Sequence, residues 1–549
     1  MQPRFGMLIV ALILFFALVG CENASSAPPN SITSTNPQDT SAPADFTILS
    51  GSENESLKPI IKEFADQKGV TIALDTSKGS VDIMLALKQK DIPYDAVWPA
   101  SHIWTDLAGT PSRISRAKSI MKSPVVFAVR KSLAEQWGWT KTPVRVSDIL
   151  AKAQSGDLRW MMTSASQSNS GACFYLACVN AFAGNPSTLT AAMLENPQIT
   201  QKIKSIFGTV TRSAGSTGFL KKTYLNAPKA YGGMATYESL MIETNQALIA
   251  SGEEPLYAVY PTDGVTFADS PLGYVDRGDN KKQALFDELQ AYLLSPAIQS
   301  RLLDLGRRVG LGTTIDNPNP AVFNPEWGIR ATQKLPISHL PEAATIKLAL
   351  DKYQTAFRKP SLNIFVLDYS GSMEGERVDR LKTAMGQMLD QTQAKDFFLQ
   401  ASERDINVVI TFNSAVDNVW EVKGNKQSEL MQVLKNVNLK QPQGGTAIYT
   451  ALETALSKVK QYGSGDTYLP AIILLTDGES RNSGVDTLEH LQQVAQAQGF
   501  TKIPPIFAMK IGEASADQLQ EVVKWSNSGD FFADTSDLPA TFRKIKGYN

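Results

Sequence analysis

The stretch from Asn363 to Met373, which reads NIFVLDYSGSM, constrains the fold of this chain more than any other. Its large apolar residues are followed at once by polar ones, a pattern typical of a buried parallel strand that ends in a loop. Open α/β sheets bind ligands beyond the carboxyl ends of such strands. Asp368, Ser370 and Ser372 alternate, so an extended loop would point all three oxygens the same way. These hard donors suit Mg²⁺ or Mn²⁺, although a tight turn that caps the next helix would use the same residue types.

Two later stretches favour the metal site over the simple turn. The segment QGGT ends at Thr446, just before a helical pattern, and the apolar run AIILLTD ends at Asp477. This combination of Asp-x-Ser-x-Ser, Thr and Asp in three segments resembles the metal-ion-dependent adhesion site of the von Willebrand factor A (vWA) family. The resemblance spans roughly Leu362 to the C-terminus. It implies a doubly wound, Rossmann-like α/β domain with one divalent cation at Asp368, Ser370, Ser372, Thr446 and Asp477.

The same resemblance implies how the cation would act. Ser370 and Ser372 would bind it directly, and Thr446 directly or through water. The two aspartates would hold waters and orient the hydroxyls. We expect Mg²⁺, with Mn²⁺ or Ca²⁺ as alternatives. Because few charged groups would touch the ion, an acidic residue of a protein partner would complete its coordination. The alternative is a metal that only stabilises the loops and binds no partner.

Length and composition indicate an ordinary globular protein. The 549 residues allow two or more domains, and 43% hydrophobic with 19% charged residues is usual for a soluble fold. The net charge of −1 implies no general attraction for nucleic acid. His102, His339 and His490 lie far apart, which argues against a histidine-rich metal site. The chain has no GxSxG, HExxH, CxxC or Walker A pattern, and neither Glu374 nor Glu479 has an obvious catalytic partner, so we do not expect an enzyme.

The first residues have the layout of a secretory signal. Arg4 precedes an apolar run from Met7 to Leu18 that is short for a transmembrane helix. The run ends in LVGC, which resembles the lipobox of bacterial lipoproteins. That resemblance implies a signal peptide over residues 1–21, cleaved before Cys21, with lipid on the Cys21 thiol; an uncleaved anchor is the alternative. Residues 22–44 are rich in Ser, Thr, Pro and Ala and are predicted to be a flexible tether.

Residues 45–324 alternate short apolar strands with amphipathic helices, which predicts a mainly parallel sheet. Serines recur where strands lead into helices, and backbone N–H groups at helix N-termini suit polar or anionic ligands. Any one of these serines alone would equally serve as a plain helix cap. The order of elements resembles a two-lobed, type II periplasmic solute-binding protein of the kind used by ABC importers. The resemblance implies a cleft for an oxyanion or a polar organic solute, lined by Ser50, Ser52, Ser80, Ser101, Ser168, Ser170, Tyr237 and Glu238.

The rest of the first domain and the linker carry weaker signals. Cys173 and Cys178 fall on different sides of a predicted helix, so we expect buried free thiols rather than a disulfide. The proline-rich segment 318–341 is expected to loop across the first domain. Apolar residues on one face of 342–358 predict a helix that joins the domains. We therefore expect a linker over residues 325–360 and a vWA domain over 361–549.

Three functions are compatible with these patterns. The first is an exported, lipid-anchored binding protein, periplasmic or extracellular, that binds a small solute with one domain and a protein partner with the other. The second is the substrate-binding component of an ABC-type transporter with an accessory vWA docking domain. The third, a metal-dependent hydrolase, has the least support because no nucleophile or general base stands out. A neighbouring permease gene would favour the second function. Partner binding that is lost on chelation would favour the first.

Overall fold

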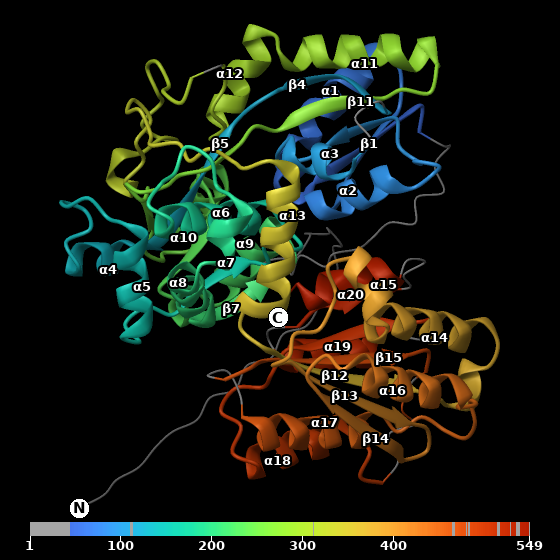
Figure 1. Ribbon diagram of the computed structural model, residues 1–549. Coiled ribbons are helices and arrows are strands. Elements are labelled where there is room, and N and C mark those ends of the chain that lie inside the picture. The colour runs from blue at the N-terminus through green and yellow to red at the C-terminus, as the bar shows by residue number, and fades with distance from the viewer. Residues whose placement is uncertain are drawn as a thin grey trace, which may run out of the picture. The chain divides into compact units, whose positions relative to one another are not determined.

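The structure is a computed structural model that describes residues 44–109, 113–310, 312–463, 467–478, 480, 484–512, 516–526, 529–533 and 538–547. The predicted signal peptide, the lipidation site Cys21 and the tether as far as Pro43 lie outside these residues. Three sheets with helices packed on their faces make up the described chain (Figure 1), which confirms the predicted α/β class. Within the described ranges, no helix is both long and apolar enough to span a membrane.

The first sheet forms one lobe of the first domain. Its strands lie in the order β2 (Ile72–Lys78), β1 (Phe46–Gly51), β3 (Ala96–Trp98), β11 (Pro271–Val275) and β4 (Ile114–Ser119). The lobe also contains the 3₁₀ helix η1 (Ser52–Leu57) and the helices α1 (Lys58–Lys68), α2 (Ser80–Lys88), α3 (Ile103–Leu107), α11 (Asn280–Leu293) and α12 (Pro296–Asp304). The strands β1, β2 and β3 are parallel, whereas β11 runs antiparallel to both of its neighbours. Phe46, Trp98 and Phe286 are among the apolar side chains of its core.

The second sheet forms the other lobe. Its strands lie in the order β10 (Phe267–Ala268), β5 (Ser123–Arg130), β8 (Gly233–Tyr237), β6 (Trp160–Thr163) and β7 (Val210–Ala214), with β9 (Leu256–Val259) paired to β5. Its helices are α4 (Lys131–Gln136), α5 (Val146–Gln154), α6 (Asn169–Phe182), α7 (Ala191–Glu195), α8 (Pro197–Gly208), α9 (Thr217–Asn226) and α10 (Glu238–Ala250). The prediction of a mainly parallel sheet is wrong here, since β5 is antiparallel to β8, β9 and β10. The chain enters this lobe through β5 and returns through β10, so these two strands run in opposite directions.

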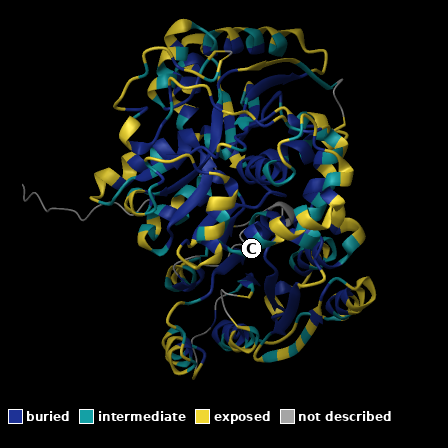
Figure 2. Cartoon of the chain, turned by 60° about the vertical axis from the view of Figure 1, so that its left-hand side comes forward, coloured by how far each residue is buried: buried dark blue, intermediate teal, exposed yellow. Residues whose placement is uncertain are grey.

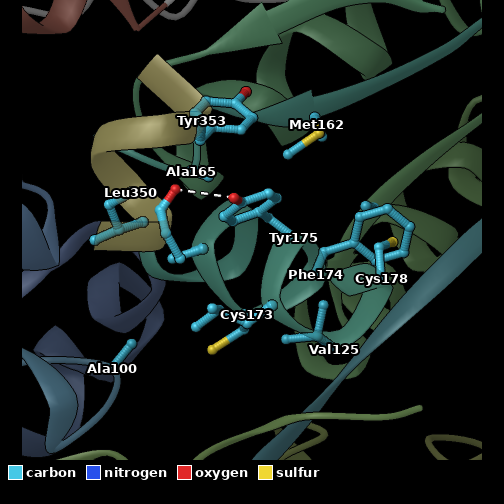
Figure 3. Packing of buried hydrophobic residues seen from close by; sticks show 14 of the residues in the cluster. Ala100, Val125, Met162, Ala165, Cys173, Phe174, Tyr175, Cys178, Leu350 and Tyr353 are labelled. Atoms are coloured by element: carbon cyan, nitrogen blue, oxygen red, sulfur yellow. Dashed lines mark hydrogen bonds between the residues drawn. The ribbon is translucent and has the colours of Figure 1, made fainter. Parts of the chain in front are cut away.

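Helix α6 lies at the centre of the second lobe. Every residue from Asn169 to Asn180 is buried, so protein covers the helix on all sides. Cys173 and Cys178 are free and buried, which confirms the prediction that they do not form a disulfide. Figure 3 shows both thiols among apolar side chains, together with the Tyr175 hydroxyl, which donates a 2.9 Å hydrogen bond to the Ala349 carbonyl. This bond ties α6 to the helix that leads to the second domain.

The linker runs back over the second lobe before it reaches the second domain. The Val265 amide donates to the Pro336 carbonyl at 3.1 Å, and the Ser338 amide donates to the Val265 carbonyl at 2.8 Å. The proline-rich segment therefore crosses the first domain as predicted. The predicted connecting helix is α13 (Ala343–Lys352), which continues as a π-helical turn over Tyr353–Phe357.

The third sheet forms the core of the second domain. Its order is β14 (Val416–Lys423), β13 (Ile406–Phe412), β12 (Ser361–Asp368), β15 (Leu469–Thr476), β16 (Ile506–Lys510) and β17 (Phe531–Phe532). The helices are α14 (Glu376–Leu389), α15 (Gln391–Asp396), α16 (Gln427–Leu439), α17 (Ile448–Tyr462), α18 (Leu488–Ala497), α19 (Asp517–Ser526) and α20 (Leu538–Lys546). Along β12, Ile364 and Val366 join the core under α17, whereas Phe365 and Leu367 join the core under α14. Figure 2 shows these buried strands between helices with exposed outer faces.

Strand β14 is absent from the elements expected from the sequence. It pairs antiparallel with β13 at the edge of an otherwise parallel sheet. Exposure alternates along the strand, in which Asp417, Val419 and Glu421 are exposed and the residues between them are partly buried. That period of two is typical of a half-buried strand, but the sequence does not show it, because a polar residue, Asn418, stands on the partly buried side and Val419 on the exposed side.

The two domains pack as parts of one compact unit, Ala44–Asn549. Arg543 of α20 forms a 3.2 Å ion pair with Asp82 of α2, in the first lobe. The Ser213 hydroxyl of β7, in the second lobe, donates to the Gly547 carbonyl at 3.0 Å. Helix α20 and the residue after it therefore contact both lobes of the first domain.

Candidate functional site

The candidate metal site lies where the central strands of the vWA-like sheet end. β12 and β15 are parallel neighbours, with Leu367 opposite Leu475, so their carboxyl ends meet at one edge. Asp368 ends β12, and Asp477 directly follows β15. Ser370 precedes, and Ser372 lies on, a short 3₁₀ turn, Gly371–Met373, before α14.

The side chains from these segments lie within hydrogen-bond reach of one another. The Ser370 and Ser372 hydroxyl oxygens are 3.1 Å apart, and the Ser372 hydroxyl donates to Asp477 Oδ1 at 2.8 Å. The Ser370 amide donates to Asp368 Oδ1 at 2.7 Å. A Cβ atom placed on Gly478 would lie 3.1 Å from Thr446 Oγ1 and 3.7 Å from Ser372 Oγ. The structure thus brings all the predicted metal-binding residues to one edge.

The spacing of these oxygens fits a small divalent cation. Octahedral Mg²⁺ has metal–oxygen distances of roughly 2.0–2.1 Å, so its adjacent ligands are about 3 Å apart. The 3.1 Å and 2.8 Å separations around Ser372 are close to that value. Over the part of the chain that the structure describes, there is no group of three or more His, Cys, Asp or Glu able to hold a metal. Hydroxyl and carboxylate oxygens are hard donors, which suit Mg²⁺, Mn²⁺ or Ca²⁺.

The electrostatics of this edge also favour a cation. Burial, together with the nearby Asp477 carboxylate, raises the pKa of Asp368 to about 6, although the hydrogen bonds from Thr476 and Ser370 lower it. Arg377 donates to Asp477 Oδ2 at 2.5 Å and to the Ser372 carbonyl at 3.0 Å. Thr476 and Arg377 were missed in the sequence. Each donates a hydrogen bond to a predicted site residue, Thr476 to Asp368 and Arg377 to Asp477, but neither is part of the sequence motif.

Backbone hydrogen bonds hold the loops of this edge together. The Gly371 amide donates to the Gly444 carbonyl at 3.0 Å, and the Gln443 amide donates to the Tyr369 carbonyl at 2.8 Å. The Thr446 loop is therefore attached to the serine loop independently of any side chain.

The first domain contains a small cavity where its lobes and their connecting segments meet. The cavity holds about 20 Å³ and is lined by Glu53, Asn54, Ala100, Met121, Lys122, Ser123, Tyr237, Ser239, Ala268, Ser270 and Arg307. Of the predicted cleft residues, Tyr237 lies in its wall. Ser50 and Ser101 lie next to the wall, since Ser50 Oγ accepts a 3.0 Å bond from Asn54 and Ser101 follows Ala100. Glu53, Asn54 and Ser270 belong to no recognisable sequence motif and were not predicted.

The other predicted serines form bonds within the protein. The Ser80 hydroxyl accepts from the Ala100 amide at 3.1 Å, and Ser52 accepts from the Gly218 amide at 3.3 Å. Ser170 Oγ lies 2.9 Å from Thr217 Oγ1, which is 3.4 Å from Ser168 Oγ. These hydroxyls bond to other segments of the protein. None of them caps the helix that follows it, so the prediction of plain helix caps is wrong for these serines.

Glu238 lies in the protein interior rather than on the cavity wall. Its two carboxylate oxygens accept bonds of 2.8 and 2.7 Å from the Arg308 guanidinium, and the Tyr260 hydroxyl also donates to it. Both members of this ion pair have at most 1% exposure, and the Glu238 carboxylate contributes to raising the pKa of Arg308. The cleft assignment of Glu238 is therefore corrected. Its partner, Arg308, lies 70 residues away in the chain, so this ion pair could not be predicted from a local sequence pattern.

Two family matches define the class of protein. Residues 46–308 match the bacterial extracellular solute-binding protein family, and residues 364–543 match the von Willebrand factor type A domain. The chain thus carries a solute-binding domain followed by a vWA domain, and domains of these two kinds are typically non-catalytic.

Individual proteins resemble parts of the chain. The human inter-alpha-trypsin inhibitor heavy chain H6 is 31% identical over 176 residues, which cover 30% of this chain and 12% of that protein. The structure of a periplasmic thiamin binding protein is 10% identical, and the match covers 56% of this chain and 95% of that one, with a TM-score of 0.44. The structure of a von Willebrand factor type A protein from Catenulispora acidiphila is 15% identical, and the match covers 35% of this chain and 43% of that one, with a TM-score of 0.28. Because both scores are low, we draw no functional conclusion from these structures.

Proposed function

We propose that this protein is an exported, lipid-anchored binding protein that holds a small polar solute in its first domain and a protein partner on its vWA domain. The partner contact would be made through a divalent cation. The observation that supports this most is that oxygen-bearing side chains from three segments share one edge of the vWA sheet.

The cation would be held by the residues at that edge. The hydroxyls of Ser370 and Ser372 would bind it directly, and Thr446 directly or through water. Asp368 and Asp477 would hold waters and orient the hydroxyls. Mg²⁺ fits this donor set, with Mn²⁺ or Ca²⁺ as alternatives. When bound, the ion supplies a positive centre that hydroxyl ligands leave largely unneutralised.

An acidic side chain of another protein is the expected ligand of that centre. Ser372 is exposed and Thr446 is half-buried, whereas Asp368 and Ser370 are buried. The accessible side of the site is therefore lined by neutral hydroxyls, which would not repel a carboxylate. A charge-assisted contact there would be roughly twice as strong as one between neutral groups.

Calorimetric titration of Mg²⁺ into the fragment that starts at Ala44 tests the metal site. Ser370→Ala removes one oxygen donor and adds no charge, so it should weaken Mg²⁺ binding clearly. Ser457→Ala is the matched control, because Ser457 is an exposed serine of α17 that donates to the Glu453 carbonyl. Equal Mg²⁺ affinity in both variants and the wild type would refute the site. Partner capture that is insensitive to EDTA would refute the adhesion mechanism instead.

The lipid anchor requires a separate test, because Cys21 lies outside the described residues. Its basis is the LVGC sequence at residues 18–21. Lipid labelling of cells that produce the Cys21→Ala variant should fall to background. Labelling equal to that of the wild type would refute an anchor at this residue.

A second candidate is the substrate-binding component of an ABC-type transporter, with the vWA domain as a docking accessory. The match of residues 46–308 to an extracellular solute-binding family favours it. Deletion of the gene should then abolish uptake of one solute by cells, and chelation-sensitive partner capture without any uptake defect would argue against it.

A further inference from the structure

The small cavity between the lobes is lined by buried oxygen atoms that have no hydrogen-bond partner in the described residues. Glu53 Oε1, Asn54 Oδ1 and Ser270 Oγ in its lining are buried, and within the described ranges none has a hydrogen-bond partner. Asn54 is fully buried and Ser270 is 5% exposed. Ser101, adjacent to the lining residue Ala100, adds a fourth such oxygen. Because a buried polar atom left unpaired costs about 1–3 kcal/mol, their concentration at one cavity points to a ligand.

Two of the four unpaired atoms at the cavity belong to acceptor groups, the Glu53 carboxylate and the Asn54 amide oxygen. The Asn54 side-chain nitrogen already donates to Ser50 Oγ at 3.0 Å, which leaves its amide oxygen to be satisfied. A carboxylate and an amide oxygen accept hydrogen bonds and cannot donate them. A ligand that is itself only an acceptor, such as sulfate, would leave the Asn54 amide oxygen unsatisfied, and the ionised Glu53 carboxylate would repel it.

The charges around the cavity also favour a cation. Of the two basic residues in the wall, Arg307 has Nη1 2.7 Å from Glu243 Oε1, and Lys122 makes an interaction of its own. Burial raises the pKa of Glu53 to about 7 in spite of the Arg307 charge. The Glu53 carboxylate is therefore not fully stabilised by the protein's own cations.

We infer that this cavity binds the protonated amine end of a small solute. An ammonium group has three N–H donors, which match Glu53 Oε1, Asn54 Oδ1 and Ser270 Oγ, and its charge balances the carboxylate. The cavity of about 20 Å³ is close to the room that one water-sized group needs, which suits an ammonium group better than a tetrahedral oxyanion. The inference rests on the proposed solute binding by the first domain, and it selects polar organic amines over the oxyanions also expected from the sequence.

Thermal melts of the fragment that starts at Ala44 test the amine class. Methylammonium chloride should raise the melting temperature saturably, and sodium sulfate at equal ionic strength should not. Glu53→Gln and Asn54→Leu should each weaken the apparent methylammonium affinity at least tenfold. Glu55→Gln is the matched control, since Glu55 lies on the same 3₁₀ helix but is exposed and bonds to Lys58. It should leave the affinity unchanged.

Calorimetry in two buffers with different ionisation enthalpies gives an independent readout. Methylammonium binding near pH 7 should release protons from Glu53. The other charged or titratable groups of the wall are Lys122, Arg307 and Tyr237. Glu53→Gln should abolish the release.

Two outcomes would overturn the inference in different ways. Saturable protection by sulfate that depends on Asn54 would exclude the amine class and leave solute binding intact. Protection by neither salt, together with no small molecule in the native mass spectrum of protein purified from its own cells, would exclude both the amine class and the proposed solute binding.

Discussion

The two serine-rich regions of this molecule use their hydroxyls in opposite ways. At the vWA edge, Ser370 and Ser372 contact each other and Asp477 where the sheet meets the surface. In the first domain, Ser80 and Ser170 are buried, and they bond to a backbone amide or to neighbouring hydroxyls. Serines at fixed spacing beside an aspartate thus predicted a shared site. Serines that merely follow strands mostly stabilise the junction where they lie.

The largest expected effect concerns Glu238, the predicted cleft residue that lies in the core. Glu238→Ala would leave Arg308 buried without its partner, so the free energy of unfolding should fall by about 3–5 kcal/mol. Urea unfolding of the fragment that starts at Ala44 measures this change. Glu254→Ala removes a partly exposed ion pair with Arg130 and should cost less than about 1 kcal/mol. A stable Glu238→Ala variant that fails to bind solute would restore Glu238 to the cleft.

The next effect is a pH dependence at the cavity of the first domain, which adds to the one expected from Asp368, whose pKa is also raised. The pKa of Glu53 is raised from 4.5 to about 7, so the folded state holds this proton more tightly than the unfolded state. Stability should therefore fall as pH rises from about 4.5 through 7 and then level off. We expect a loss of about 2 kcal/mol, less than the full shift implies, because the residue is only partly buried. Glu53→Gln should flatten this part of the unfolding profile, and an identical slope in both proteins would contradict the prediction.

A smaller change in free energy is expected at the vWA edge. Asp477→Ala removes the carboxylate that receives the Ser372 hydroxyl, and the loss of such an orienting group typically weakens metal binding about 10–100-fold. The melting temperature should stay near that of the wild type, because the buried strands β12 and β15 are unchanged. Asp379→Ala, on the exposed face of α14, is the matched control for Mg²⁺ titration. A loss of affinity in both variants would indicate a general charge effect rather than a site.

The smallest effect should come from the serines of the first domain. Ser80→Ala leaves the Ala100 amide without its acceptor, which should cost about 1 kcal/mol of stability without any change in Mg²⁺ affinity. Ser428→Ala, near the exposed start of α16, should be neutral in the same thermal melts. If Ser80→Ala were also neutral but abolished solute protection, Ser80 would belong to the solute site after all.

The sequence by itself determined the α/β class and the residues that meet at the vWA edge. The reason is that this information is local. The alternation of Asp368, Ser370 and Ser372 depends only on an extended backbone, and the apolar runs before Asp368 and Asp477 could be read as parallel strands. Carboxyl ends of neighbouring parallel strands meet at one edge, so a motif split over three segments still predicts one place in space.

Only the tertiary structure decided how the polar residues of the first domain are used. Glu238 is neutralised by Arg308 from the far end of the domain, a contact that no spacing rule contains. Glu53 and Asn54 line the cavity because the first lobe closes against Tyr237 and Ser239 of the second, which depends on two crossings of the chain between the lobes. Burial and pairing are set by residues distant in sequence. Serines and acids that look alike in the chain therefore become links between segments, core ion pairs or binding groups only in the folded protein.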